Sequence, residues 1–343
     1  MTFGPFMTAA SAHTSASIAA FSHSSASFAG FWRRVAAFIV DAFVLGFIGY
    51  ALGLVFFDAF VRLGPAGRCV GFVVALAYFV LQESGRGGGQ SLGKRLLRIR
   101  VVDAHGRALS PALGAVRFAV FGVPYFLTGA ALPLGLATFA GGFVVAVLGL
   151  GGVLALAYLL VFNRRTRQSL HDLAVGACVV RVPVHDPARL APPAVELWRG
   201  HRVITAVLVL LAGGIPLLFP QWMHAPLSAD LQALDRRLAA EPGLRSVNVF
   251  ALANHRYGED VDGVRHELLV QATLVSPVVD DVALSTRLAG MALAGFPEAN
   301  RLDEISVRLA HGFDIGIASN WTANELALTP AQWADRLAAG VGN

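Results

Sequence analysis

The sequence predicts a multi-pass α-helical membrane protein that carries a C-terminal soluble α+β domain. Hydrophobic residues make up 55% of the 343 residues and charged residues only 14%, against about 25% charged residues in ordinary globular proteins. The mean hydropathy is +0.61. The chain also contains five apolar runs of roughly the length that crosses a bilayer, about 20 residues. These observations exclude a disordered chain and a wholly soluble enzyme.

The five predicted membrane spans cover residues 35–57, 67–82, 116–136, 141–162 and 203–219. In the first span, Gly49 and Gly53 have the G-x-x-x-G spacing that favours close helix packing or dimerisation. In the third span, Pro124 and Pro133 predict a kink or an early end of the helix.

The distribution of charge sets the orientation of these spans. Residues 1–221 contain 18 Lys or Arg and 7 Asp or Glu, whereas residues 222–343 contain 9 and 15. If the N-terminus is inside, 16 of the 18 basic residues before position 222 lie on the inner side and only Arg62 and Arg68 lie on the outer side, as the positive-inside rule requires. The basic pI of 9.8 is therefore a topology signal, and no nucleic-acid partner is expected.

The organisation of the chain follows from these spans. Residues 1–29 contain no charged side chain and lack the pattern of a secretory signal, so they are predicted to be a disordered cytoplasmic tail. Residues 30–182 hold four spans, and residues 183–202 form a cytoplasmic linker to the fifth span at 203–219. Residues 222–343 form the extracytoplasmic α+β domain.

In the C-terminal domain the apolar pattern predicts the element order αββαββα. Thr329 and Pro330 have the residue types preferred at the N-cap and first position of the last helix. The predicted helices cover 228–240, 279–294 and 330–339, and the predicted strands cover 244–252, 266–276, 305–311 and 313–319. The last two strands flank Gly312, which predicts a hairpin at that glycine.

Asp41 is the costliest residue to place, because a carboxylate inside a span costs about 2.5–3.5 kcal/mol. Arg34 lies two helical turns earlier, about 10 Å along the axis, so a partner from another span or loop is expected for Asp41. Two interpretations stay open. Asp41 is either a buried polar clamp between helices or an ion or proton site.

The segment between the second and third spans is glycine-rich and basic. Its letters match a phosphate-binding loop from Gly88 to Lys94, but Arg95 replaces the Ser or Thr that holds magnesium, and a span precedes it. A nucleotide site is therefore rejected. Residues 97–102 alternate with period two, which predicts a short β-hairpin or extended arm. Its basic side chains are expected to face anionic lipid headgroups, at about 1 kcal/mol each: Lys94, Arg95, Arg98 and Arg100. A possible strand at 178–182 could pair with residues 99–102.

No catalytic residue, metal site or cofactor is predicted, and the protein is not expected to be an enzyme. Cys69 and Cys178 fall on opposite membrane faces, which excludes a disulfide, and no Cys/His spacing suits zinc. The acidic residues Glu259, Asp260 and Asp262 lack the full calcium-loop pattern, so a solvated turn is favoured over a weak cation site.

Three motifs resemble the RDD family of bacterial membrane proteins. They are residues 30–41 (GFWRRVAAFIVD), 89–103 (GQSLGKRLLRIRVVD) and 167–173 (RQSLHDL), and the resemblance covers about residues 30–182. The arginine and two aspartates that name the family correspond to Arg34, Asp41 and Asp172. Ser91 stands where the family often has Thr. The resemblance implies a four-helix bundle in the cytoplasmic membrane, and transport, including cation/proton exchange, has been proposed for some members.

The sequence leaves two functions open. The first is transport of an ion or small solute, with Asp41 as the intramembrane polar site. The alternative is a membrane-anchored binding or sensing protein whose outer domain recognises a partner. The expected partners are the bilayer, with its anionic headgroups at the inner face, and either a second copy of the chain or an unidentified protein at the outer domain.

Overall fold

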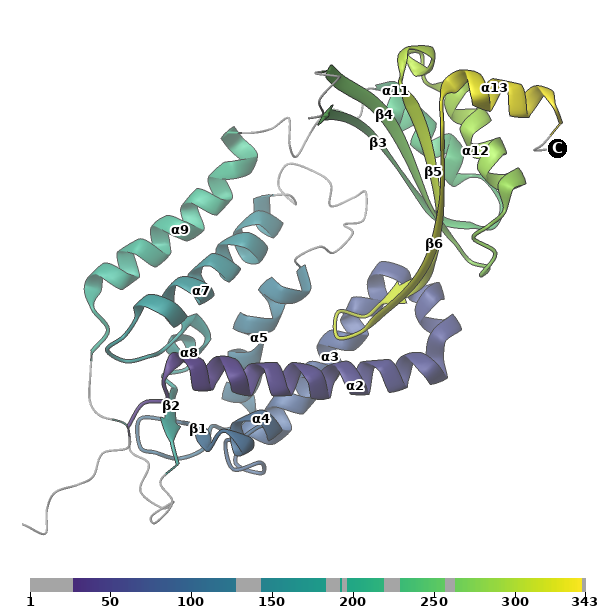
Figure 1. Ribbon diagram of the computed structural model, residues 1–343. Helices are drawn as coiled ribbons and strands as arrows, with labels where there is room; N and C mark the ends of the chain where they lie inside the picture. The colour runs from purple at the N-terminus through teal and green to yellow at the C-terminus, as the bar shows by residue number, and fades with distance from the viewer. Residues whose placement is uncertain are drawn as a thin grey trace, which may run out of the picture.

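A computed structural model of the chain describes residues 27–127, 143–182, 192, 196–218, 229–256 and 263–340 (Figure 1). It contains a helical domain followed by a C-terminal sheet domain. Several predictions lie outside the described residues: the tail up to residue 26, the end of the third apolar run with Pro133, most of the linker, and the acidic group Glu259, Asp260 and Asp262.

The first two apolar runs form a helical hairpin. Helix α2 spans Phe31–Leu63 and helix α3 spans Gly67–Glu83, joined by the 3₁₀ turn η1, Gly64–Ala66. Gly64 ends α2 with a φ of 52°, a left-handed value that glycine adopts without steric cost. Both predicted spans, 35–57 and 67–82, lie within these helices.

The later apolar runs are also helical where they are described. Helix α5 covers Pro111–Leu127 and includes Pro124. Ser110 caps its start, with Oγ accepting a hydrogen bond from the Leu113 amide at 3.3 Å. A π-helical turn, η3 at Ala146–Gly151, leads into α7, Gly152–Phe162, and α9 covers Arg199–Leu218.

Aromatic and small residues pack these helices together. Phe72 of α3 meets Phe126 of α5, and Phe79 meets Phe118, each with ring centroids 5.5 Å apart, so α3 and α5 run antiparallel.

Among the described residues, two helical segments are long and apolar enough to cross a membrane, Phe31–Glu83 and Phe143–Phe162. The first of these comprises both α2 and α3.

A small sheet lies at the end of the helical domain where α2 begins. Strand β1, Ile99–Val102, follows the short helix α4, Leu92–Leu96. Strand β1 pairs antiparallel with β2, Cys178–Arg181, which confirms the predicted pairing and the extended conformation of residues 99–102. The short β-hairpin predicted as the other possibility is not formed, because the partner strand lies in a distant segment. Ser27 and Ala29 also bond to β2 through backbone groups, so residues 27–29 belong to this sheet and not to the tail predicted for residues 1–29.

The C-terminal domain follows the predicted order αββαββα. Its sheet has the strand order β3-β4-β5-β6, in which β4 and β5 are parallel and the other neighbours are antiparallel. Helix α12 provides the crossover that a parallel pair requires. The elements are α11 (Ala229–Ala239), β3 (Leu244–Arg256), β4 (Gly263–Leu274), α12 (Val282–Gly295), β5 (Glu304–Asp314), β6 (Ser319–Leu328) and α13 (Pro330–Ala338).

The three helices of this domain cover one face of its sheet (Figure 1). Leu234 and Leu238 of α11 are fully buried against the inward residues of the strands. Trp333 of α13 is fully buried too, and its indole N–H donates to the Ile305 carbonyl at 2.9 Å. Thr329 caps α13 in a capping box with Gln332, in agreement with the prediction.

The predicted hairpin at Gly312 is wrong. Strand β5 continues through Gly312 to Asp314, and the chain reverses over residues 315–318 before β6 begins. Gly316 has a φ of 79°, and its amide donates to the Asp314 carboxylate at 2.7 Å, so these two residues supply the turn chemistry. Gly312 serves close packing instead, because a Cβ there would lie 2.0 Å from the Asn320 carbonyl oxygen.

Candidate functional site

Charged side chains from five elements meet inside the helical domain, next to the β1–β2 sheet. They come from the starts of α2 and α5, the end of α3, and the short helices α4 and α8 (Leu170–Ala174). All are largely buried, so each charge depends on a protein partner. The buried charge cluster comprises Arg34, Asp41, Glu83, Lys94, Arg117 and Asp172.

Asp172 is the centre of one half of this cluster. Its carboxylate is fully buried and forms ion pairs with Arg34 and with Arg117, the latter through Nη2 at 2.7 Å and Nε at 3.0 Å. Arg34 also donates to the Arg167 carbonyl. Asp172 accepts the Ser169 amide at 3.2 Å, which places it in the first turn of α8. The arginine of α2 is thereby linked to a segment 138 positions later.

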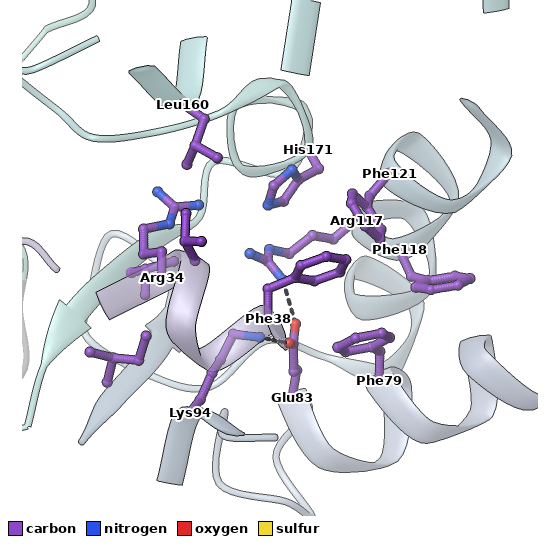
Figure 2. Close-up of a pocket in the computed structure, with 13 residues that line it drawn as sticks. Arg34, Phe38, Phe79, Glu83, Lys94, Arg117, Phe118, Phe121, Leu160 and His171 are labelled. Carbon is purple, nitrogen blue, oxygen red and sulfur yellow. Dashed lines mark hydrogen bonds and ion pairs between the residues drawn. The ribbon is translucent and has the colours of Figure 1, made fainter. Parts of the chain in front are cut away.

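Glu83 is the centre of the other half. Its carboxylate lies between Arg117 and Lys94 and pairs with both (Figure 2). Arg117 thus bridges Glu83 and Asp172, and Lys94 also lies 3.8 Å from Asp41. The three carboxylates and three cations form one continuous chain of opposite charges.

Hydrogen bonds to Asp41 join helix α2 to α3 and to the start of α4. The fully buried carboxylate accepts hydrogen bonds from the Tyr78 hydroxyl at 2.7 Å, the Ser91 hydroxyl at 2.5 Å and the Gly93 amide at 2.8 Å. Its partners therefore come from α3 and from the start of α4, in the segment between the second and third predicted spans, and not from Arg34. Gly93 needs to be glycine here, because a Cβ would lie 2.1 Å from the Ala37 carbonyl oxygen.

The four basic loop residues do not share one environment. Lys94 lies inside the charge cluster, which corrects the prediction that it faces lipid headgroups. Arg95 and Arg98 are exposed and Arg100 is half-buried. Arg95 donates to the Gln90 and Gly87 carbonyls at 3.2 Å, so it braces the glycine-rich turn.

A cavity of about 220 Å³ borders the charge cluster (Figure 2). Charged and polar side chains line one part of it, and phenyl rings from α2, α3 and α5 line another. The polar lining residues are Arg34, Glu83, Lys94, Arg117 and His171, and the rings are those of Phe38, Phe79, Phe118 and Phe121. A space of this kind suits a small solute that has both apolar and polar parts.

A second, smaller cavity of about 70 Å³ has Phe38, Phe79, Phe118 and Phe121 in its lining too. Apart from Tyr125, its remaining lining is apolar and includes Ala75, as well as Ile317 from the turn between β5 and β6. The four shared rings therefore separate the two spaces, one beside the charge cluster and one beside the C-terminal domain.

The charges of the cluster determine how its neighbours titrate. Burial lowers the pKa of His171 from 6.5 to about 3, and the nearby Arg117 and Arg34 act in the same direction, against the opposing effect of Asp172. His171 is therefore neutral at physiological pH. Burial would raise the pKa of Asp172, but the positive charges of Arg34 and Arg117 outweigh it and hold that pKa well below its usual range.

The low pKa of His171 predicts a stability that falls as the pH is lowered. Between pH 6.5 and about 3 the unfolded chain binds a proton at His171 that the folded chain does not, so unfolding becomes easier. At pH 5 the loss relative to neutral pH is about 2 kcal/mol. Thermal unfolding of the detergent-solubilised protein at pH 7 and pH 5 measures it. His171→Gln removes the titration and should reduce this difference, whereas an equal difference in both proteins contradicts the assignment.

Sequence reasoning singled out Arg34, Asp41 and Asp172 but missed four residues of the site. Tyr78 carries no pattern that marks it, whereas His171 lies within the motif at residues 167–173 but is assigned no role there. The sequence does mark Glu83 and Arg117. Glu83 follows the second apolar run and Arg117 lies at the start of the third, so both fall on the same predicted side of the membrane. Opposite charges at matching depth in adjacent spans point to an ion pair.

The ionic groups of the site neutralise one another in pairs. Within the described parts of the chain, no group of three or more His, Cys, Asp or Glu side chains is placed to hold a metal ion. The cluster fixes five elements relative to each other, and the cavity beside it offers the space for a ligand.

Comparison with known families agrees with this geometry. The model of the RDD family matches residues 28–176, a range that begins at the strand contact of Phe28 and ends after α8. No curated protein and no solved structure matches the chain. The family is membrane-associated, and the apolar helices agree with a membrane location. The chain therefore carries, over residues 28–176, a domain of the RDD family.

Proposed function

We propose that this is a multi-pass protein of the bacterial cytoplasmic membrane whose RDD domain takes part in the transport of an ion or small solute. The observation that carries this proposal is the cavity of about 220 Å³ beside the buried charge cluster. Apolar helices surround it, and such polar groups within membrane domains commonly line a substrate or ion path. No catalytic or cofactor role is proposed for it.

In the proposed topology the N-terminus is inside and the C-terminal domain is outside. The start of α2, the end of α3 and the start of α5 supply charges to one cluster, as expected of consecutive spans that alternate in direction. The same arrangement puts the β1–β2 sheet on the inner side, where the exposed Arg95 and Arg98 just before β1 meet anionic headgroups.

Asp41 is proposed to support the cavity and not to hold the solute directly. Its three hydrogen-bond donors use both carboxylate oxygens. Two of these donors, Ser91 and Gly93, belong to the segment that positions Lys94 at the cavity wall. Asp41 is therefore a positioning residue in this proposal.

Reconstituted protein tests the transport function. Proteoliposomes loaded with a pH-sensitive dye should respond to imposed H⁺, Na⁺ or K⁺ gradients faster than protein-free liposomes. Val35→Phe narrows the cavity and should slow the response at least several-fold. Val73→Phe adds the same bulk at a valine that is 59% exposed on α3 and should leave it unchanged.

Two results would contradict transport. One is a response equal to that of protein-free liposomes for all three ions, which contradicts proton-coupled transport of these ions. The other is equal slowing by Val35→Phe and Val73→Phe, which would separate the flux from the cavity. An Asp41→Leu protein that inserts correctly but keeps the wild-type flux would remove Asp41 from the proposal, because leucine accepts none of the three hydrogen bonds.

The alternative function is binding or sensing by the C-terminal domain. It is favoured by the sheet face opposite to α11, α12 and α13, which no other described element covers. Arg308 and Phe250 are exposed on strands of this face. A photo-crosslinker at Phe250 in the intact protein should capture a second copy or another protein in cells. The absence of any crosslinked product argues against this function.

A further inference from the structure

The turn between β5 and β6 reaches into the helical domain. We call residues 313–318 the hairpin tip. Strands β5 and β6 extend beyond the three helices of their own domain towards α2 and α3 (Figure 1). Phe313 is 3% exposed and packs against Phe57 and Phe60 of α2, with ring centroids 5.4 and 5.3 Å apart. Ile315 is fully buried.

Glycines on both helices make room for the hairpin tip. A Cβ on Gly71 would lie 1.7 Å from the Ile315 carbonyl oxygen, and one on Gly53 would lie 2.5 Å from the Phe313 ring. At Gly49 the nearest atom is the Ala318 Cβ at 2.8 Å. The G-x-x-x-G spacing of α2 therefore serves a β-turn, where the sequence predicts helix packing or dimerisation.

Polar contacts fasten the same tip. Arg68 of α3 pairs with Asp314, through Nη2 at 2.7 Å and Nε at 3.0 Å, and its Nη1 donates to the Phe126 carbonyl at 3.1 Å. The Tyr125 hydroxyl donates to the Gly316 carbonyl at 3.1 Å. Three helices thus hold the tip by both apolar and polar groups.

The tip lies deep along the helices. Gly49 lies 14 residues before the end of α2 at Leu63, with a kink at Phe56 between them, and a straight helix of this length would rise about 21 Å. Non-helical backbone at membrane depth is tolerated where protein buries it, and the helices bury Phe313 and Ile315 in this way. Ile317 lines the smaller cavity, which the four phenyl rings separate from the cavity at the charge cluster.

We propose that the hairpin tip is a plug, contributed by the C-terminal domain, that closes the outer end of the path through the RDD domain. This inference rests on the proposed transport function, because a plug has a role only if there is a path to close. It deepens that function by naming what controls access to the path. Withdrawal of the tip opens the smaller cavity to the outer side. The C-terminal domain therefore controls access to the cavity at the charge cluster.

Cysteine accessibility in the full-length protein tests the plug without knowledge of the solute. Ala75 lines the smaller cavity and is buried. In a Cys69→Ala, Cys178→Ala background, Ala75→Cys should react slowly with a membrane-impermeant methanethiosulfonate reagent added outside proteoliposomes. Adding Gly71→Ala unseats the tip by the clash with Ile315 and should accelerate labelling at least tenfold. Gly214→Ala, at a helical glycine with open space around it, is the matched control and should change nothing.

A charge swap supplies a second test should Gly71→Ala fail to fold. Arg68→Asp and Asp314→Arg should each accelerate labelling of the cysteine at position 75, and the double variant should slow it again. Equal labelling in parent, Gly71→Ala and Gly214→Ala, or a double variant that labels as fast as the single variants, overturns the plug. Faster labelling in a protein that shows no ion flux would support the plug and would contradict only the proposed transport function.

Discussion

Arg117→Met should lower the free energy of unfolding by about 3–5 kcal/mol, the cost of leaving a buried charge without its partner. The substitution removes the cation that neutralises both Glu83 and Asp172. Methionine keeps similar bulk, so the loss reports charge more than packing. Denaturant titration of the protein in detergent micelles, followed by intrinsic fluorescence, measures the change.

Arg107→Met is the matched control for this prediction. Arg107 pairs with Asp103 at 3.2 Å, but its side chain is 76% exposed, and exposed ion pairs contribute about 0–1 kcal/mol. Arg107→Met should therefore lower the free energy of unfolding several-fold less than Arg117→Met does. Equal losses in the two variants would mean that the buried charge cluster does not hold the helices together.

Asp41→Leu should destabilise the protein by about 3 kcal/mol or more, because each buried donor left without an acceptor costs about 1–3 kcal/mol. Leucine accepts no hydrogen bond, so the donors on Tyr78, Ser91 and Gly93 lose their partner. The segment that carries Lys94 then loses its attachment to α2. Thermal and denaturant unfolding should both show the loss.

Asp41→Asn should cost far less, about 1 kcal/mol. The amide oxygen can still accept from Tyr78 and Gly93, and the amide nitrogen can donate to the Ser91 hydroxyl. This variant removes the charge while keeping the clamp, which makes it suitable for the flux measurement. Equal destabilisation by leucine and asparagine would show that the negative charge, and not the hydrogen bonding, is what the site requires.

Much of the local structure could be predicted from the sequence, because its causes lie within a few residues. Apolar runs marked the helices, and Thr329 with Pro330 marked the start of α13. The alternation of residues 97–102 marked a strand that the structure pairs with β2. Turn chemistry was less clear, since Gly312 and Gly316 offer similar signals and only Gly316 lies at the turn.

The partners of the charged residues could not be predicted in the same way. Arg34 and Asp41 share one helix, yet Arg34 pairs with Asp172 and Asp41 with Tyr78, Ser91 and Gly93. Which charge meets which depends on the side-by-side packing of helix ends far apart in sequence. Lys94 is an example. The sequence predicts that it faces lipid headgroups, but its ammonium group forms a buried ion pair with Glu83.

The sequence by itself determined the membrane character of the protein, the RDD motif and the order of elements in the C-terminal domain, since hydropathy and short motifs act locally. Only the tertiary structure decided that Glu83 and Arg117 complete the buried charge cluster and that the β5–β6 turn sits against α2 and α3. The Arg68–Asp314 pair joins residues 246 positions apart. Contacts of that kind arise from packing and close glycine approaches, which no local pattern encodes.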